Sequence, residues 1–160
     1  WLYSDSKTES CFPRFINRDL RNLTKDDLSG FDAVIHLAEL SNDPLGENNP
    51  GLTHVINHQG SVNLAKNAKR AGVSRFIYTS SCSVYGLGSG DFLTEESPVN
   101  PQTAYAVCKT LVEKDVGQLA DDSFSPVFLR NSTAYGASPR MRFDIVLNNL
   151  SGLAWTSKKR

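Results

Sequence analysis

The chain has 160 residues, of which 39% are hydrophobic and 21% are charged, a composition that fits one globular domain with a sizeable core. Its 17 Lys and Arg residues balance its 17 Asp and Glu residues, so the formal net charge is zero and disfavours nucleic acid as a partner. No apolar run has the length of a membrane span and no signal-peptide pattern is present, which predicts a cytoplasmic protein with no membrane partner. The cysteines Cys11, Cys82 and Cys108 lack metal-ligand spacing, and we expect reduced thiols.

From residue 32 onward, short apolar runs alternate with longer helix-like stretches, which predicts a parallel α/β sheet. The compact apolar run 32–38 predicts a buried central strand. A long helix is expected next, with Asn49 as its cap, Pro50 in its first turn and Gly72 at its end.

The second half of the chain continues this alternation. Its expected elements are a strand at 74–79, a polar connection at about 80–101, a helix from about 100 to 121, a strand at 126–130, a loop at 132–142 and a helix at about 143–155. A connection as long as the first one is more often functional than decorative.

Both ends of the sequence are interpreted as cut. A doubly wound dinucleotide fold needs a first strand, a glycine turn and a helix, and none of them precedes Asp19. We therefore expect residues 1–160 to form a single partial domain, a Rossmann-like doubly wound parallel α/β sheet in three layers that lacks its first βαβ unit. A substrate-binding region is expected to start near residue 132.

One pair of residues, Tyr105 and Lys109, has the spacing of an acid/base site. Four positions apart on an expected helix, they project from one face, which also carries Val112 and Val116 and should pack inward. A phenol has a pKa of about 10, and a nearby ammonium lowers it by about 1–3 pH units, toward the range useful for proton transfer. This spacing also arises by chance, so the pair needs support from elsewhere in the chain.

Support comes from the hydroxyl-rich stretch 79–86, Thr-Ser-Ser-Cys-Ser-Val-Tyr-Gly, which follows an expected strand. Parallel α/β sheets bind ligands beyond the carboxyl ends of their strands, where hydroxyls can donate hydrogen bonds to a substrate oxygen. The alternative for this stretch alone is a loop that is merely polar.

The histidines are a rival constellation. His54 and His58 have the spacing of some zinc sites, but no nearby carboxylate or cysteine completes a ligand set, so we expect solvent-facing or capping histidines and no metal. His36 lies within a strand run and is expected to be a hydrogen-bonded core residue.

Taken in order, four segments of the sequence resemble the extended short-chain dehydrogenase/reductases, in their nucleotide-sugar epimerase/dehydratase group. These segments are 32–38, 75–86, 105–109 and 129–136, and the resemblance spans about residues 15–155. It implies an enzyme that uses NAD or NADP and acts on a nucleotide sugar.

The resemblance also implies roles for individual residues. Tyr105 matches the catalytic acid/base, Lys109 the residue that lowers the pKa of that tyrosine and binds the nicotinamide ribose, and Ser81 the hydroxyl that contacts the reacting sugar oxygen. The further residues that match cofactor contacts are Asp19, Leu20, Leu37, Ala38 and Asn57. Those that match substrate contacts are Thr133, Asn149 and Leu150.

Three departures from the family pattern bear on function. The glycine loop that holds the cofactor pyrophosphate on a helix N-terminus is missing from the sequence. Cys82 and Ser83 stand where the dehydratase branch has an acidic pair, which disfavours water elimination. Thr133 stands where many epimerases have Asn.

The resemblance therefore implies an NAD(P)-dependent nucleotide-sugar epimerase that works by Tyr-assisted hydride transfer. One alternative is a sugar-nucleotide reductase or dehydratase with the same three residues, and another is a catalytically silent, truncated Rossmann-like domain. A missing first unit would expose apolar faces of the sheet, so we also expect a homo-oligomer.

Overall fold

The computed structural model describes residues 16–41, 43–88, 92–139 and 141–157. The described residues divide into two compact units, the first formed by residues within 18–132 and the second by residues 16–17, 133–139 and 141–157. The first unit holds the whole β-sheet, and residues 133–157 of the second unit contain the helix α7, Val146–Ser157. None of the described helices is long and apolar enough to cross a membrane.

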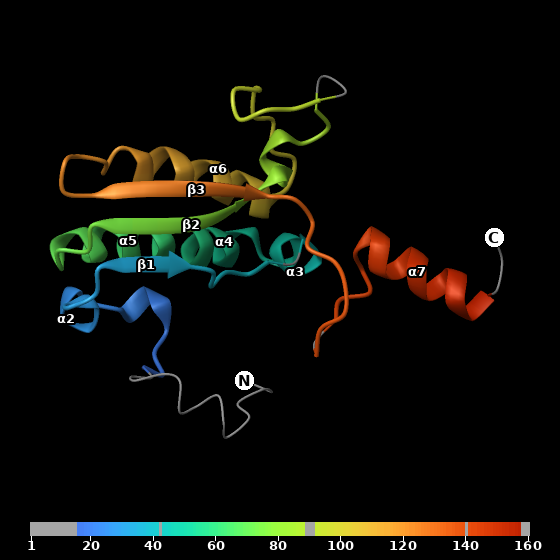
Figure 1. Ribbon diagram of the computed structural model, residues 1–160, viewed down its shortest axis with the longest axis horizontal. Coiled ribbons are helices and arrows are strands. Elements are labelled where there is room, and N and C mark those ends of the chain that lie inside the picture. Colours follow the sequence, from blue (N-terminus) through green and yellow to red (C-terminus); the bar gives the residue numbers. More distant parts are fainter. Residues whose placement is uncertain (1–15, 42, 89–91, 140, 158–160) are drawn as a thin grey trace. The chain divides into compact units, whose positions relative to one another are not determined.

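Three parallel strands in the order β1-β2-β3 form the sheet (Figure 1). Their bounds are Ala33–His36, Arg75–Ser81 and Ser125–Asn131. Ile35 pairs with Ile77, and Ile77 in turn pairs with Val127, so all three strands end at the same edge. Within the described residues β2 is the central strand. Among these three strands β1, which the sequence places in the centre of the sheet, pairs with β2 on one side.

The two longest helices of this unit pack on one face of the sheet (Figure 1). In chain order, the helical elements are η1 Leu20–Asn22, α2 Lys25–Leu28, α3 Asp43–Asn48, α4 Pro50–Thr53, η2 His54–Gly60, α5 Ser61–Arg70, η3 Cys82–Tyr85 and α6 Ala104–Gly117. The core lies between the sheet and α5 and α6, where Phe76 and Tyr78 of β2 are fully buried against Leu64 and Val112.

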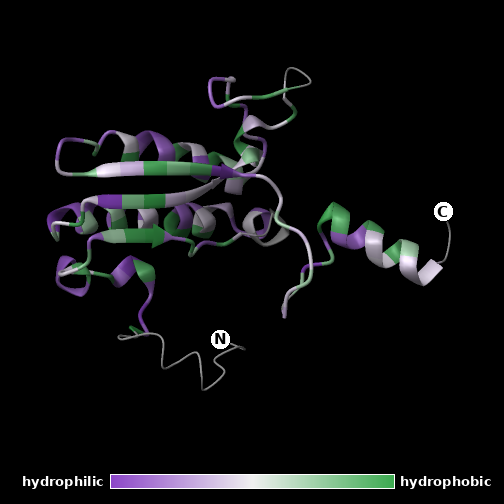
Figure 2. Cartoon of the chain, in the orientation of Figure 1, coloured by the Kyte–Doolittle hydropathy of each residue, from purple (hydrophilic) through white to green (hydrophobic). Residues whose placement is uncertain are grey.

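The other face of the sheet is exposed within the described residues. Ile35 is 64% exposed and Val127 is 44% exposed, although both are large and apolar. Hydrophobic stretches run through all three strands, as parallel strands with two covered faces would have (Figure 2). The residues of this unit thus form two layers of the three that the sequence predicts.

The long helix expected after β1 is present, with a π-helical segment inside it. Asn49 caps it by accepting a hydrogen bond from the Leu52 amide at 2.9 Å, and Pro50 occupies the first turn. The middle turns, η2, are π-helical, and Gly60 at their end is closely packed, because a Cβ there would lie 2.8 Å from Leu20 Cδ1. Gly72 follows the helix at φ +85°, a conformation that favours glycine.

The polar connection after β2 is tied back to the sheet edge. Gly86 has φ +60°, and a Cβ on it would lie only 2.0 Å from the Asn100 carbonyl oxygen. The Asn100 amide in turn donates to the Val84 carbonyl at 2.8 Å. Helix α6 then begins at Ala104 with Thr103 as its cap, slightly later than expected.

Candidate active site

Helix α6 presents Tyr105 and Lys109 on the face that meets the sheet. Lys109, Val112 and Val116 are all buried, which confirms that this face packs inward. Tyr105 lies in the first turn and is partly buried, and the Lys109 ammonium lies 5.3 Å from the centre of its ring. The i, i+4 spacing therefore brings the two side chains together as the sequence predicts.

The ammonium group of Lys109 links α6 to the carboxyl ends of β1 and β2. It donates a hydrogen bond to the Thr79 carbonyl oxygen and lies 4.4 Å from the centre of the Tyr78 ring. It also forms an ion pair with Glu39, at 2.7 Å from Nζ to Oε2, and both side chains are only 4% exposed. Two of the three N–H donors of Lys109 thus face protein oxygens.

Glu39 lies three residues after β1 and is held by groups from three elements. Its Oε1 accepts hydrogen bonds from the Tyr78 hydroxyl at 2.5 Å and from the Ser61 hydroxyl at 3.5 Å. Ser61 also contacts His36 Nε2 at 2.7 Å. Among the described residues, Oε2 has no hydrogen bond besides its ion-pair contact with Lys109.

Burial controls the ionisation of this cluster. It raises the pKa of Glu39 and lowers that of Lys109, because both groups are taken out of water, while their mutual attraction opposes each shift. Burial and the charge of Lys109 lower the pKa of His36 to about 4, so His36 is the neutral, hydrogen-bonded core residue that the sequence predicts. Burial and the nearby Glu39 raise the pKa of Tyr78 far above its usual value, which keeps Tyr78 a hydrogen-bond donor.

Ser81 ends strand β2, two residues after the carbonyl that Lys109 contacts. Its side chain is partly exposed and accepts a hydrogen bond from the Ser83 amide at 3.2 Å, so it caps the short helix η3. The neighbouring Ser80 is buried and donates to Glu113 at 2.5 Å. Of the hydroxyls in this stretch, Ser81 is thus one that a ligand at the sheet edge can reach.

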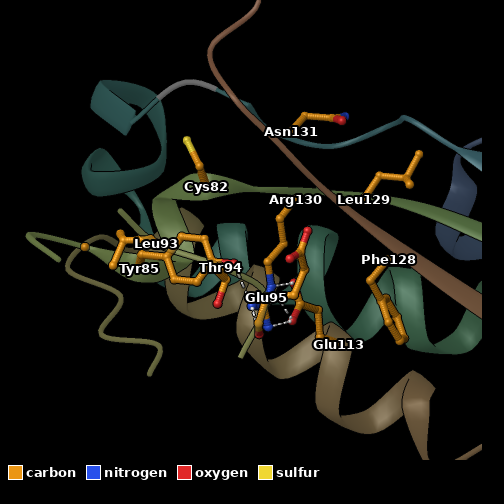
Figure 3. A pocket seen from close by; sticks show the side chains of 11 residues that line it. Cys82, Tyr85, Leu93, Thr94, Glu95, Glu113, Phe128, Leu129, Arg130 and Asn131 are labelled. Atoms are coloured by element: carbon orange, nitrogen blue, oxygen red, sulfur yellow. Dashed lines mark hydrogen bonds and ion pairs between the residues drawn. The ribbon is translucent and has the colours of Figure 1, made fainter. Parts of the chain in front are cut away.

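A cavity of about 830 Å³ opens beside the carboxyl ends of β2 and β3 (Figure 3). It is lined by Cys82, Tyr85, Gly86, Leu93, Thr94, Glu95, Glu113, Phe128, Leu129, Arg130 and Asn131. Arg130 points toward Glu113 of α6 and pairs with both of its carboxylate oxygens, the shortest contact being 2.7 Å. Because Arg130 also donates to the Tyr85 hydroxyl and the Glu95 carbonyl, it fastens the connection after β2 to the sheet.

The residues expected at the cofactor have different surroundings. Leu37 and Ala38 are exposed directly beyond β1, at the edge where Lys109 and Ser81 lie. Asn57 is fully buried, and its amide donates to and accepts from the Leu40 backbone, so here it orders the segment after β1. Asp19 caps η1 and pairs with Arg21, whose hydrogen bond lowers the pKa of Asp19 to about 2.

The residues expected at the substrate, other than Ser81, belong to the second unit. Thr133 begins this part, and Asn149 and Leu150 are exposed on α7. Asn149 donates to the Phe143 carbonyl at 3.0 Å. The buried Asn148 orders the preceding loop through Gly136 and Arg142. Their roles toward a substrate stay predictions.

The two spaced histidines are not solvent-facing, which corrects that expectation. His58 contacts His54 at 3.2 Å and Asp115 of α6 at 2.7 Å, so it joins η2 to α6. In the described part of the chain, no group of three or more His, Cys, Asp or Glu side chains is arranged to hold a metal ion.

Comparison with known proteins identifies the family. The model of the NAD dependent epimerase/dehydratase family matches residues 4–152, nearly the whole chain. The chain belongs to this family. The UDP-glucose 4-epimerase 2 of Oryza sativa subsp. japonica is 33% identical over 114 residues, which cover 68% of this chain and 27% of that protein. The UDP-glucose 4-epimerase of Vibrio cholerae is 36% identical over 100 residues, which cover 60% of this chain and 30% of that protein.

Solved structures agree with this assignment. MoeE5 in complex with UDP-glucuronic acid and NAD has a TM-score of 0.75 and 29% identity, over 86% of this chain and 46% of that one. RMD from Pseudomonas aeruginosa complexed with NADPH has a TM-score of 0.70 and 30% identity, over 81% of this chain and 46% of that one. The fold is thus α/β and Rossmann-like, as the sequence predicts. The chain spans about a third of the curated relatives that it matches and about half of these solved chains.

The family is NAD-dependent, and the sheet edge of this chain fits a nicotinamide cofactor in part. Leu37 and Ala38 offer an exposed apolar surface directly before Glu39, the partner of Lys109. Lys109 fits a ribose less completely, because the Thr79 carbonyl and the Glu39 carboxylate occupy two of its donors. One donor of the ammonium thus remains for a ribose hydroxyl.

Two features of the site lie outside the residues that sequence reasoning selected. Glu39 was missed, although an acidic residue just after an apolar strand is a signal of a side chain at the ligand-binding edge. The Arg130–Glu113 pair was missed as well, because its partners come from different elements and have no shared sequence motif.

Proposed function

We propose that this chain forms the catalytic part of an NAD(P)-dependent nucleotide-sugar epimerase. The observation that carries the proposal is the position of Lys109, whose ammonium lies beside the Tyr105 ring and on the Thr79 carbonyl, two residues before Ser81. A phenol, an ammonium and a hydroxyl are thus gathered at the carboxyl edge of a parallel sheet, where such folds bind their ligands.

Each of these residues has a distinct task in the proposed reaction. Tyr105 takes the proton from a sugar hydroxyl and later returns it, with Lys109 favouring the phenolate form. Ser81 donates a hydrogen bond to the same oxygen and holds it in place. A bound nicotinamide supplies hydride transfer to and from the sugar carbon. An epimerase returns the hydride to the opposite face of that carbon, so no net redox change results.

The substrate class and cofactor come from the relatives. The curated relatives named above are UDP-glucose 4-epimerases, and the MoeE5 and RMD structures hold NAD and NADPH respectively. We infer a nucleotide-sugar substrate, with Thr133, Asn149 and Leu150 as further contacts to it. We also propose that NAD or NADP binds at Asp19, Leu20, Leu37 and Ala38, and that Asn57 supports this site by ordering the segment after β1. A homo-oligomer and a cytoplasmic location complete the proposal.

Dehydratase chemistry is the second candidate, because a solved NDP-hexosamine 5,6-dehydratase, TunA, has a TM-score of 0.73 and 26% identity to this chain. Cys82 and Ser83 argue against it. Cys82 is exposed and Ser83 Oγ is buried with no hydrogen-bond partner among the described residues, and neither side chain is a carboxylic acid that can serve in water elimination.

The test is to incubate the protein with UDP-glucose and, separately, with UDP-galactose, and to identify the products by proton NMR. We expect each sugar to convert into the other, with no net change in nicotinamide absorbance, because the hydride returns to the sugar. Accumulation of a deoxy-keto sugar would instead identify a dehydratase, and stoichiometric consumption of NAD(P)H a reductase. Either of these outcomes would refute the epimerase.

A further inference from the structure

The cluster around Glu39 contains a buried charge that none of the proposed catalytic steps uses. Glu39 and Lys109 are each 4% exposed and lie 2.7 Å apart, with Tyr105 on the other side of the ammonium, at 5.3 Å from its ring centre to Nζ. A buried carboxylate is costly, and its charge beside Lys109 and Tyr105 affects proton transfer at Tyr105.

We propose that Glu39 is a positioning residue that holds Lys109 in an ion pair of zero net charge and thereby weakens the stabilisation that Lys109 gives to the Tyr105 phenolate. This inference rests on the proposed function, because it concerns the acid/base residue of that reaction. It assigns Glu39 control over the pH at which the site works.

Glu39 changes the charge that Tyr105 faces. An isolated ammonium beside a phenol favours the phenolate, whereas an ammonium with a carboxylate on its far side offers Tyr105 a dipole rather than a full charge. Loss of the Tyr105 proton next to the intact ion pair also leaves a net negative charge in a buried site, which is unfavourable. Glu39 therefore opposes the effect that Lys109 has by itself.

Glu39 is fixed independently of Lys109, because the Tyr78 and Ser61 hydroxyls donate to its other oxygen. Lys109 in turn is held at the Thr79 carbonyl. With both partners anchored from β2 and α5, the ion pair is built into the sheet edge.

The other ionisable groups around the cluster do not replace Glu39. They are His36 on β1, Tyr78 on β2, and Cys108 and Glu113 on α6. His36 and Tyr78 are neutral near pH 7, burial raises the pKa of Cys108 to about 11, and Glu113 is paired with Arg130. Glu39 is thus the carboxylate among them that contacts the Lys109 ammonium.

The test is a pH titration of the Tyr105 phenolate by its near-ultraviolet absorbance, taken as the difference between each protein and its own Tyr105→Phe counterpart. In Glu39→Gln, which keeps the side-chain shape, we expect the Tyr105 midpoint to fall by about one pH unit. Glu39→Asp keeps the charge but draws it back by one methylene, so a smaller shift of the same sign is expected. Glu39→Asp also serves if Glu39→Gln does not fold, as judged by circular dichroism.

The matched control is Asp122→Asn, which also removes a carboxylate, because Asp122 is exposed in the turn between the end of α6 and β3, beyond the helix end opposite Tyr105. This variant is expected to titrate like the wild type. Unchanged or raised Tyr105 midpoints in both Glu39 variants would overturn the inference. The titration needs neither cofactor nor substrate, so this outcome would leave the proposed epimerase reaction standing. If the Tyr105 midpoints fall as expected but no epimerisation is observed, only the proposed reaction is refuted.

Discussion

Replacement of Tyr105 by Phe is expected to reduce turnover of a nucleotide sugar by about a thousandfold. The change removes one hydroxyl, the group that takes and returns the sugar proton in the proposed reaction. The ring stays, so the contact with the Lys109 ammonium, 5.3 Å from the ring centre in the wild type, is retained. We therefore expect cofactor affinity and the unfolding midpoint in urea to remain close to those of the wild type.

Tyr135→Phe is the matched control for this prediction. Tyr135 is 69% exposed and lies in the second unit, so loss of its hydroxyl should leave turnover unchanged. The measurement is initial rate against substrate concentration for both variants in any form of the protein that shows epimerase activity. Normal turnover in Tyr105→Phe would exclude Tyr105 as the acid/base.

Replacement of Lys109 by Met is expected to lower both activity and stability. The variant loses the ammonium beside Tyr105 and leaves the Glu39 carboxylate, 4% exposed, without its counter-ion. Removal of one partner of a buried ion pair costs about 3–5 kcal/mol in the free energy of unfolding. We expect a loss of about 3 kcal/mol at neutral pH, measured by urea unfolding, and turnover lowered by at least about a hundredfold.

The stability loss in Lys109→Met should depend on pH in a defined direction. Burial already raises the pKa of Glu39 above its usual value of 4.5, and removal of Lys109 takes away its strongest opposing influence. The folded state then binds a proton more tightly than the unfolded state, so stability falls as pH rises above about 4.5 and recovers below it. If the loss in the free energy of unfolding is the same at every pH between about 4 and 8, an unpaired Glu39 carboxylate is not its cause.

The double variant Glu39→Gln and Lys109→Met is the control for this effect. It removes both buried charges together, and such replacements are often neutral or stabilising. We expect it to recover most of the stability lost in Lys109→Met, while turnover stays low because Tyr105 still lacks its ammonium. The difference between the single and double variants measures the coupling between the two residues.

The sequence predicts the elements of this unit well where hydrophobic periodicity is strong. The strands β2 and β3, the inward face of α6 and the cap at Asn49 all agree with the expectations. The order of the strands could not be predicted from periodicity. A continuous apolar run, such as that at 32–38, fits any strand with two covered faces and does not show where in the sheet the strand lies. The π-helical turns of η2 were also missed, since a local widening of the helix changes the spacing only slightly.

The candidate site was predictable where its residues share one element. Tyr105 and Lys109 meet because they are one helical turn apart on α6. Glu39 was not predictable from spacing, because the chain leaves the strand after His36 and the direction of the next side chains depends on tertiary contacts with Tyr78 and Ser61. The sequence predicts Asn57 at the cofactor, but its side-chain amide is buried and both its oxygen and its nitrogen form hydrogen bonds with the Leu40 backbone.

The most direct test of the account is a titration of the purified chain with NADH, followed by nicotinamide fluorescence and by a search for cofactor released on denaturation. The account predicts saturable binding, because the sheet edge at Leu37, Ala38 and Lys109 is proposed to hold the nicotinamide. No binding up to about millimolar cofactor, the upper end of the range in which enzymes bind their substrates, would contradict it. The Tyr105–Lys109 pair would then be an inherited but idle arrangement in this chain.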